Sequence, residues 1–419
     1  MQKLAIRGAK RLSGEIPLQG AKNSALALLA GCALCSGEVR LKNCPALSDV
    51  FAACRILNKL GCKCSYHDHC VSVDARDMNC CAVPEELMRE MRSSIVFLGA
   101  ILGRKGECEL SPPGGCELGP RPIDMHLSAM EQMGVRISEE YGGMCCECPG
   151  GLHGARIDLG FPSVGATENI MLAAVLAKGE TVITNAATEP EITDLGNFLV
   201  RCGARIRGQG TPTVVISGVD KLHGCEYSVM PDRIVAATFM SAAAVTGGEL
   251  DIKGADPRHM RSVISVFQQM NCSVFTYDDR IFISAKKPLC AVNTIRTMPY
   301  PGFPTDAQAP VMAALAKAAG TSVMVENIFS NRYRHVDELV RMGADIKTEG
   351  KVAVIRGVKK LCGATVRALD LRGGACLVLA ALGAQGESRV ENLCYIDRGY
   401  ENIETVLRSV GADIKRIKS

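Results

Sequence analysis

The apolar positions of this chain follow a pattern that recurs about every 70 residues. Each copy holds an almost wholly apolar stretch, a glycine-marked turn, an alternating strand, an amphipathic stretch and a second alternating strand. In Ser48–Leu60 the apolar residues fall on one face at helical spacing. We expect an outer helix there, with Ser48 as its N-cap and Gly61 as its C-terminal stop.

Six copies of this unit are present, and each ends in a short turn that leads into its last strand. The turn residues are Gly61, Gly134, Gly203, Asn271, Gly343 and Gly411. The unit is longer than the 20–50 residues of solenoid repeats. The first stretch of each unit is apolar nearly all round, which predicts a buried helix, and the amphipathic stretch predicts an outer one.

This pattern predicts an α/β fold with two domains of three units each. The first domain would span residues 22–230 (units 1–3), and the second would combine residues 1–21 with 231–419 (units 4–6). The segment before Lys22 would then complete the last unit.

Composition supports a globular protein of more than one domain. The chain has 419 residues and a mass of 44.6 kDa, with 47% hydrophobic and 22% charged residues. A net charge of +4 gives no broad basic field for nucleic acid or a membrane surface. The longest apolar run, Ala25–Cys35, is well short of the ~20 residues that span a bilayer. We expect a cytoplasmic protein without an obligate protein partner.

The chain contains 21 cysteines, which raises the question of a metal site. Two clusters are suggestive, but neither has the paired C-x2-C spacing of structural zinc. They comprise Cys62, Cys64, His67, His69 and Cys70, and then Cys145, Cys146 and Cys148. We predict reduced thiols, no metal and no cofactor. A non-catalytic, cysteine-rich, metal-binding repeat protein remains the alternative from a different class.

Polar and charged residues open the predicted buried helices. These openings are Lys22-Asn23, Arg92-Ser93-Ser94, Ser163–Thr167, Asp232-Arg233, Thr305-Asp306 and Asp370–Gly374. A helix N-terminus carries partial positive charge and free N–H groups, and it therefore suits a phosphate. Two facing domains would surround a cleft with the cations Lys22, Arg92, Arg121, Arg233, Arg332, Arg372 and Arg398. The pattern favours a small, multiply anionic substrate bound between the domains.

Two further features carry candidate chemistry. The segment from Pro113 to His126 holds three glycines and three prolines, which predicts an irregular loop, and it carries Cys116 near Arg121. A thiol beside a guanidinium can act as an acid or a nucleophile, although a solvated connection with an incidental thiol is the alternative. Asp306 and Asp370 are each either a base for a hydroxyl group or a helix N-cap.

Eight motifs, taken together and in order, resemble one known family along the full length of the chain. They are Leu18–Asn23, Met91–Ser94, the Cys116 loop, Phe161–Thr167, Thr305–Gln308, Glu326–Arg332, Asp370–Arg372 and Ile396–Glu401. The chain resembles the UDP-N-acetylglucosamine 1-carboxyvinyltransferases of the EPSP synthase superfamily. The resemblance implies two inside-out, barrel-like α/β domains, each of three repeated units, with the active site in the cleft between them.

The resemblance also implies a reaction and its substrates. The 3-hydroxyl of UDP-N-acetylglucosamine would take the enolpyruvyl group of phosphoenolpyruvate, releasing phosphate, in the first committed step of peptidoglycan synthesis. The catalytic residues implied are Cys116, Asp306, Lys22 and Arg398. Cys116 would be the general acid at C3 of phosphoenolpyruvate and the target of fosfomycin, and Asp306 would face the 3-hydroxyl.

The substrate-binding residues implied by the resemblance fall into two sets. Lys22, Arg121, Arg332, Arg372 and Arg398 would surround the phosphate and carboxylate, with Asp370 beside them. The nucleotide sugar would contact Asn23, Arg92, Arg121, Pro122, Ile123, Asp124, Met125, Ser163, Val164, Gly165, Asp306 and Ile328.

One position departs from the family pattern and one sister family competes with it. Phe161 stands where some family members carry a lysine that contacts the diphosphate. The rival is 5-enolpyruvylshikimate-3-phosphate synthase, which uses the same donor. The Cys116 loop, Lys22-Asn23 and Ser163–Gly165 favour the UDP-sugar acceptor.

Overall fold

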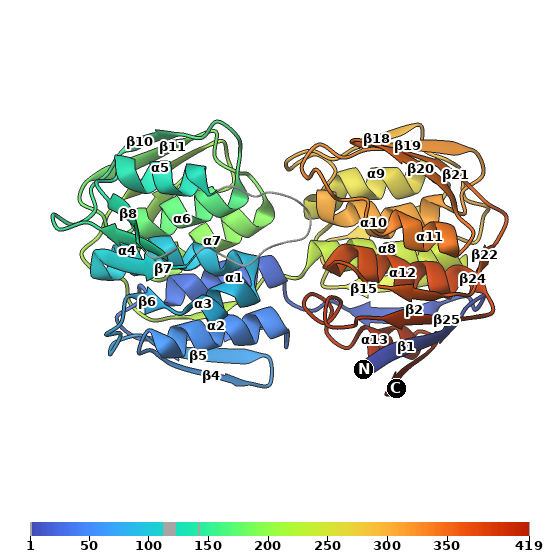
Figure 1. Cartoon of the computed structure of the whole chain (residues 1–419), viewed down its shortest axis with the longest axis horizontal. Coiled ribbons are helices and arrows are strands. Elements are labelled where there is room, and N and C mark those ends of the chain that lie inside the picture. The colour runs from blue at the N-terminus through green and yellow to red at the C-terminus, as the bar shows by residue number, and fades with distance from the viewer. Residues whose placement is uncertain (1, 112–122, 141–142, 419) are drawn as a thin grey trace. The chain divides into compact units, whose positions relative to one another are not determined.

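The computed structural model describes residues 2–111, 123–140 and 143–418, which form two compact units (Figure 1). The N-terminal unit comprises the described residues from 20 to 230. The C-terminal unit comprises residues 2–19 and 231–418. Each unit has its own hydrophobic core.

The N-terminal unit is built around three buried helices that pack against one another. These are α1 (Lys22–Cys32), α4 (Phe97–Lys105), which follows the 3-10 helix η1 (Arg92–Val96), and α6 (Val164–Ala174). The remaining helices are α2 (Ser48–Lys59), α3 (Glu85–Glu90), α5 (Asp124–Gln132) and α7 (Pro190–Arg201).

Three separate four-stranded sheets complete the N-terminal unit. The first contains β14 (Glu226–Ser228), β3 (Glu38–Lys42), β5 (Cys70–Asp74) and β4 (Lys63–His67), in that spatial order. The second contains β6 (Ala82–Val83), β7 (Glu107–Leu110), β9 (Gly143–Glu147) and β8 (Arg136–Glu140). The third contains β10 (Arg156–Asp158), β11 (Glu180–Thr184), β13 (Thr213–Ser217) and β12 (Arg205–Arg207).

The C-terminal unit repeats this plan around three other buried helices. Those helices are α8 (Arg233–Thr246), α10 (Thr305–Leu315) and α12 (Leu371–Gly383), and each packs against the other two. The shorter helices are η2 (Pro257–Met260), α9 (Arg261–Gln269), α11 (Val336–Arg341) and α13 (Ile403–Ser409).

The sheets of the C-terminal unit have the same pairing pattern, with one parallel and two antiparallel pairings in each. The first contains β16 (Ser273–Tyr277), β17 (Arg280–Ser284), β15 (Glu249–Lys253) and β2 (Ser13–Pro17). The second contains β18 (Thr294–Arg296), β19 (Thr321–Val325), β21 (Val352–Arg356) and β20 (Asp345–Glu349). The third contains β23 (Thr365–Arg367), β25 (Glu387–Glu391), β1 (Gln2–Arg7) and β26 (Asp413–Lys418), and a short pair joins β22 (Leu361–Cys362) to β24 (Ala384–Gln385).

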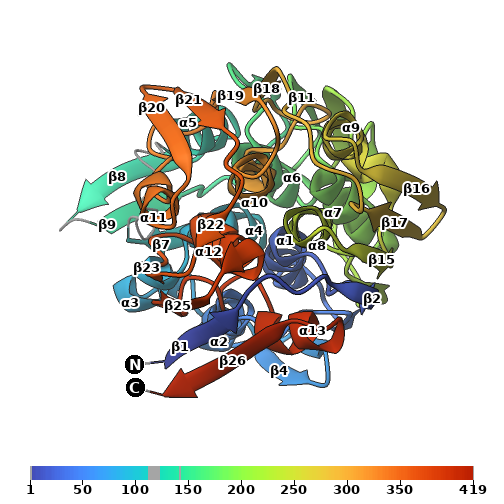
Figure 2. The same ribbon diagram turned by 90° about the vertical axis from the view of Figure 1, so that its right-hand side faces the viewer.

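The first strand of the chain therefore lies in the last sheet. β1 is hydrogen-bonded between β25 and β26, and Leu4 lies opposite both Val390 and Arg416. The two ends of the chain lie side by side at these strands in both views (Figures 1 and 2).

Backbone conformation explains the residue that marks each repeat. The six marker residues follow the outer helices, and all of them have positive φ angles. The angles are 93° at Gly61, 96° at Gly134, 103° at Gly203, 69° at Asn271, 90° at Gly343 and 99° at Gly411. Glycine adopts this left-handed region without strain and asparagine tolerates it better than most residues, which accounts for the exception at Asn271.

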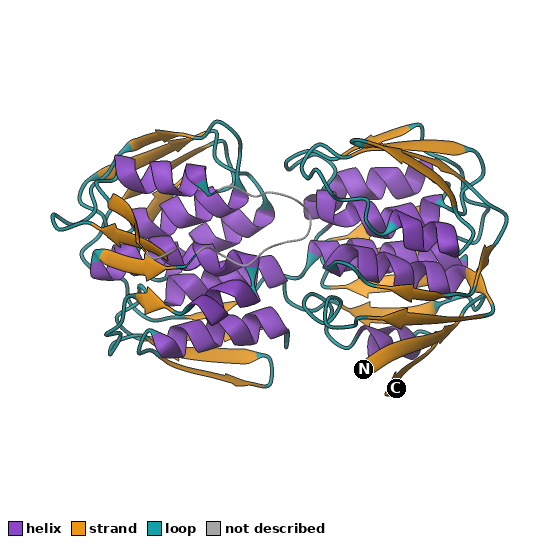
Figure 3. Ribbon diagram, viewed as in Figure 1, coloured by secondary structure: helices purple, strands orange, loops and turns teal. Residues whose placement is uncertain are grey.

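The predicted inside-out arrangement is confirmed. In each unit the central helices lie inside and the strands lie outside them (Figure 3). Every residue of α1 except Asn23 is buried, as the apolar pattern requires. Within the described ranges of the chain, the six four-stranded sheets stay separate and do not join into a closed barrel. Among the described residues, the helices are all too short or too polar to traverse a bilayer.

The N-cap of the outer helix α2 lies one residue before the predicted position. Ser48 is the first helical residue and Leu47 occupies the N-cap position, without a side-chain hydrogen bond. The prediction of Ser48 as N-cap is therefore wrong. Gly61 does follow the end of the helix, with the left-handed backbone that stops it.

Candidate functional site

A carboxylate held by two arginines lies in the C-terminal unit. Asp306 is in the first turn of α10, and its Oδ1 accepts a hydrogen bond of 2.8 Å from Nη2 of Arg332. Its Oδ2 lies 3.2 Å from Nη2 of Arg372, which is in the first turn of α12. The arginine side chains are 2% and 3% exposed, whereas that of Asp306 is 28% exposed. Two buried guanidiniums thus orient a carboxylate that a ligand can still reach.

The structure shows which of Asp306 and Asp370 is a helix N-cap. Asp370 is the N-cap of α12, because its Oδ1 accepts from the N–H groups of Arg372 (3.0 Å) and Gly373 (2.9 Å). Asp306 does not occupy the N-cap position of α10, which belongs to Pro304. The second oxygen of Asp370 is buried and, within the described residues, has no hydrogen-bond partner.

Polar atoms that lack partners lie on the same arginines. Nε of Arg332 and Nε of Arg372 are buried, and no hydrogen-bond acceptor is found for them among residues 2–111, 123–140 and 143–418. Leaving a buried charged donor unsatisfied is costly. These N–H groups therefore suit an anionic ligand with several oxygen acceptors.

The remaining predicted residues of this unit are positioned by local hydrogen bonds. Ile328 follows the buried Glu326, whose Oε1 accepts from the N–H of Ile328 at 2.8 Å and from that of Phe329 at 3.1 Å. Arg398 lies in the turn before α13 and is half-buried. Gln19 anchors that turn, since its side chain bonds to the carbonyl of Gly399 and the N–H of Glu401.

In the N-terminal unit, Lys22 and Asn23 open helix α1. Nζ of Lys22 forms a 2.6 Å ion pair with Asp49 in the first turn of α2. The next residue, Ser24, donates to the buried Asp194, which also accepts from the hydroxyl of Tyr227 at 2.7 Å. The start of α1 is thus fixed from two sides, and Asn23 stays exposed.

Two other predicted residues of this unit, Arg92 and Gly165, lie near the buried His126. The imidazole is 2.7 Å from Nδ2 of Asn169 on α6, and a Cβ placed on Gly165 would lie 3.1 Å from its Cε1. Burial, and then the charge of Arg92, lowers the pKa of His126 to about 4, so the ring is neutral at physiological pH. Arg92 and the starts of α5 and α6 therefore share one neighbourhood.

The start of α6 is capped by a side chain, and the other predicted residues nearby differ in their exposure. Ser163 is the N-cap of α6, with its Oγ accepting from the N–H of Ala166, and Val164 and Gly165 form the first turn. Ile123 and Met125 are half-buried, and Asp124 is exposed at the first position of α5. Phe161 is 43% exposed.

Cys116, Arg121 and Pro122 lie outside the described residues. Arg233 stacks over the ring of Tyr300 at 5.6 Å, at the start of α8.

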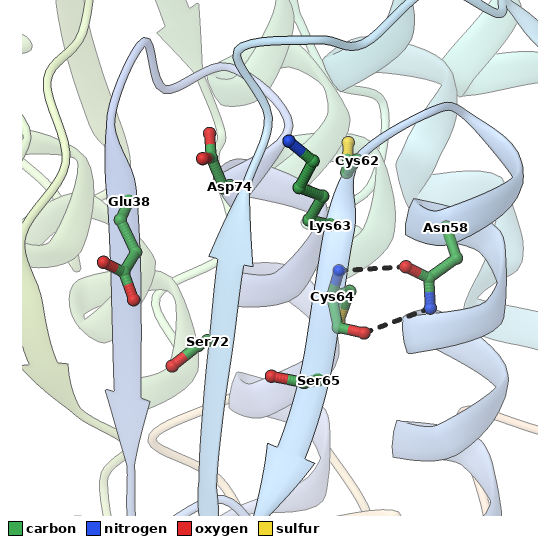
Figure 4. Close-up of a pocket in the computed structure, with 8 residues that line it drawn as sticks. All are labelled: Glu38, Asn58, Cys62, Lys63, Cys64, Ser65, Ser72 and Asp74. Carbon is green, nitrogen blue, oxygen red and sulfur yellow. Dashed lines mark hydrogen bonds between the residues drawn. The ribbon is translucent and has the colours of Figure 1, made fainter.

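Two surface pockets are lined by none of the described site residues. Each has a volume of about 510 Å³, and both lie in the N-terminal unit. One is lined by Cys62 and Cys64, and in it the side chain of Asn58 holds the backbone of Cys64 (Figure 4). The cysteine clusters form no metal-binding group of three or more ligands in the part of the chain that the structure describes. The described cysteines form no disulfide bonds.

Several supporting residues were not predicted from the sequence, because they act through contacts that form only in the folded chain. Asp49, His126, Asn169, Asp194 and Tyr400 are distant in sequence from the side chains that they touch. Two of them did carry a signal: His126 and Tyr400 lie within or directly beside motifs that matched the family.

Comparison with known proteins identifies the family. The model of EPSP synthase (3-phosphoshikimate 1-carboxyvinyltransferase) matches residues 6–407. The chain belongs to the EPSP synthase family. This match confirms the superfamily that the motifs indicated, and the relatives described next confirm the narrower resemblance.

Within the family, two similar relatives carry a more specific name. UDP-N-acetylglucosamine 1-carboxyvinyltransferase 2 of Caldanaerobacter subterraneus subsp. tengcongensis is 52% identical, with 100% of each chain covered. UDP-N-acetylglucosamine 1-carboxyvinyltransferase 1 of Symbiobacterium thermophilum is 47% identical over 99% of this chain and 95% of its own.

Solved structures of family members have the same fold. The enolpyruvyl transferase NikO from Streptomyces tendae has a TM-score of 0.90 at 25% identity, with 100% of this chain and 99% of the other covered. EPSP synthase from Acinetobacter baumannii has a TM-score of 0.76 at 20% identity, with both chains fully covered.

Proposed function

We propose that this chain transfers the enolpyruvyl group of phosphoenolpyruvate to the 3-hydroxyl of UDP-N-acetylglucosamine and releases phosphate. The relatives that share this activity in their names match the chain from end to end. The structural observation that carries the proposal is the partly exposed Asp306 carboxylate on its two buried arginines. It offers a fixed acceptor for a hydroxyl proton within a strongly cationic setting.

The reaction requires balanced proton transfers that these residues can supply. The 3-hydroxyl oxygen forms a bond to C2 of phosphoenolpyruvate, its proton passes to Asp306, and Cys116 protonates C3. The tetrahedral intermediate then loses phosphate from C2 and a proton from C3, which restores the double bond. Arginines compensate the charge of phosphate and carboxylate groups through paired N–H donors.

The anionic parts of the substrates would be divided between the residues of the two units. In the C-terminal unit, Arg332, Arg372 and Arg398, with Asp370 beside them, would bind phosphoenolpyruvate, and Ile328 would contact the acetamido group. In the N-terminal unit, Lys22 and Arg121 would add to the cations around the phosphate and carboxylate. The nucleotide sugar would contact Asn23, Arg92, the run Arg121–Met125 and Ser163–Gly165. The exposed Phe161 has no charge to offer the diphosphate, so the N–H groups at the start of α6 would hold it.

The proposal extends to the cellular role. The reaction would begin peptidoglycan synthesis in the cytoplasm, serve cell-wall growth and division, and be inhibited by fosfomycin through alkylation of Cys116. A near-neutral net charge of +4 supports small-molecule substrates rather than a nucleic acid or membrane partner.

Phosphate release from the purified protein tests this proposal. Phosphoenolpyruvate is supplied with either UDP-N-acetylglucosamine or shikimate 3-phosphate as acceptor. We expect release with the UDP-sugar alone, and release only with shikimate 3-phosphate would assign the chain to the sister activity. Absence of release with both acceptors, together with zinc in the purified protein, would support the metal-binding alternative.

A second experiment tests the thiol. Fosfomycin should add one covalent label per chain and stop turnover, and Cys116→Ser should remove the label while the protein stays folded. Labelling that persists in Cys116→Ser would exclude Cys116 as the alkylated residue.

A further inference from the structure

A chain of buried hydrogen bonds leads from helix α8 to Asp306. It passes through Tyr400, which belongs to the motif Ile396–Glu401 but is not among the predicted site residues. The tyrosine is 1% exposed. Its hydroxyl oxygen lies 2.9 Å from Oγ1 of Thr238 and 3.1 Å from Nη1 of Arg372. All four residues belong to the C-terminal unit.

The direction of each hydrogen bond in this chain is fixed. Thr238 donates its hydroxyl proton to the carbonyl of Ile234, 2.9 Å away in the preceding turn of α8. Its oxygen is therefore the acceptor toward Tyr400. Arg372 has no acceptor atom, so it must donate to the phenol oxygen. Burial raises the pKa of Tyr400, which keeps the proton that this arrangement needs.

Tyr400 controls how the guanidinium of Arg372 can turn. Nη1 is held by the hydroxyl group, Nη2 reaches Oδ2 of Asp306 at 3.2 Å, and the group lies 5.4 Å from the centre of the tyrosine ring. Nε has no hydrogen-bond partner among the described residues. Without the hydroxyl group, Arg372 would lose one of the two directional contacts that set its plane.

We propose that Tyr400 is a positioning residue for the enolpyruvyl transfer, because its hydroxyl group fixes Arg372 against the carboxylate of Asp306. Thr238 supports Tyr400 by accepting a hydrogen bond from the phenol hydroxyl group. This inference rests on the proposed function, in which Asp306 receives the proton of the sugar hydroxyl.

The test is the steady-state kinetics of Tyr400→Phe in the phosphate-release assay. Phenylalanine retains the ring that stacks on Arg372 and removes only the hydroxyl group. We expect kcat to fall about 10- to 100-fold, the factor that corresponds to losing one hydrogen bond to a charged group. The KM for UDP-N-acetylglucosamine should change by less than about threefold, because most of its proposed contacts lie in the other unit.

Two threonine variants complete the design. Thr238→Val removes the group that accepts a hydrogen bond from the phenol. The double variant with Tyr400→Phe should be no slower than Tyr400→Phe alone, because both changes interrupt the same chain of hydrogen bonds. Thr246→Val is the matched control on the same helix. The Thr246 hydroxyl makes the same bond to the preceding turn, 2.7 Å from the carbonyl of Ala242, but lies outside this network. Its kcat should equal that of the unchanged protein.

The possible outcomes separate this inference from the proposed function. If the unchanged protein does not release phosphate with the UDP-sugar, the proposed function fails. If it does, and folded Tyr400→Phe keeps a kcat within twofold, only the role of Tyr400 is overturned. Losses that multiply in the double variant would also overturn it. If Tyr400→Phe does not fold, the comparison of Thr238→Val with Thr246→Val decides, and equal kcat values would contradict the proposal.

Discussion

Lys22 and Asp49 form an ion pair of 2.6 Å in which the side chains are only 10% and 4% exposed. The pair joins the first residue of α1 to the first turn of α2. Charges in such a setting have given up most of their hydration, so each depends on the other. Lys22 is therefore held in place by a residue that has no predicted contact with substrate.

Replacing Asp49 by asparagine should impair both stability and turnover. Breaking a buried ion pair on one side typically costs about 3–5 kcal/mol, because the remaining charge stays buried without compensation. We expect a lower free energy of unfolding in urea titrations. The phosphate-release rate should also fall, because the ammonium group of Lys22 loses its position.

The control for this variant is Asp77→Asn. Asp77 pairs with Lys63 at 3.0 Å in the same unit, but these side chains are 68% and 75% exposed. Exposed pairs are screened by solvent and contribute little, so neither stability nor turnover should change noticeably. Equal effects of the two substitutions would contradict the special role of the buried pair.

The free energy of unfolding should fall in acid because the buried His126 ring must become protonated. The pKa of His126 is about 4 in the folded chain, mainly through burial, whereas an exposed histidine has a pKa near 6.5. Between these values the unfolded chain binds a proton that the folded chain does not. The contribution of His126 to stability is therefore complete above pH 6.5 and is lost as the pH drops toward 4, by about 3 kcal/mol for one such group.

This prediction is checked by urea titrations of His126→Gln from pH 7 to 4. The variant should have a flatter profile than the unchanged protein, although His335, whose pKa is lowered to about 4 by burial, contributes in the same direction. His223→Gln is the control, because His223 is exposed. An unaltered slope in His126→Gln would show that this ring is not the titrating group.

The fold was predictable because its rules are local and repeated. A glycine or asparagine after each outer helix indicates a positive φ angle, and the fully apolar stretches indicate buried helices. Each indication is weak alone, but its recurrence in six repeats makes the fold prediction specific. The one-residue error at Ser48 has a different cause, since the N-cap position depends on how Pro45 and Leu47 lead into the helix, and the pattern does not encode that.

The site was predictable only in its charged residues. Asp306, Arg332 and Arg372 are 26 to 66 residues apart, and their motifs named them although only the fold brings the three side chains together. Asp49 and Tyr400 act by holding Lys22 and Arg372, each of which lies on an earlier helix of the same repeat, and the apolar pattern does not report which polar side chains meet. No spacing rule within one repeat identifies such partners.

Glu168 should reduce stability at alkaline pH. This residue of α6 is 6% exposed, and burial, followed by the charges of Glu191 and Glu189, raises its pKa to about 8. In the unfolded chain it ionises near pH 4.5. The folded state therefore binds the extra proton between pH 4.5 and 8, and the free energy of unfolding falls as the pH rises through this range.

Glu168→Gln removes that ionisation and keeps the shape of the side chain. We expect the variant to match the unchanged protein at pH 4.5 and to exceed it at pH 8 by an amount on the order of a few kcal/mol. Thermal unfolding at the two pH values measures this difference. Glu180→Gln at the exposed first residue of β11 provides the reference and should show no such gain. A variant that is less stable at pH 8 would contradict the prediction.

The carboxylate of Asp306 should be needed for turnover but not for capturing the nucleotide sugar. Asp306→Asn keeps hydrogen-bond acceptance through one oxygen but loses the charge between Arg332 and Arg372, and it cannot take up a proton. Positioned acid–base groups typically contribute factors of about 10² to 10⁴, so we expect kcat to fall at least about 100-fold. Calorimetric titration with UDP-N-acetylglucosamine should still show binding, because most of the proposed contacts lie in the N-terminal unit.

Asp345→Asn is the control, since Asp345 pairs with Arg356 at 3.9 Å on an exposed strand of the same unit. Near-normal turnover of Asp306→Asn would remove Asp306 from its proposed role, and it would also remove the reason for Tyr400 to matter.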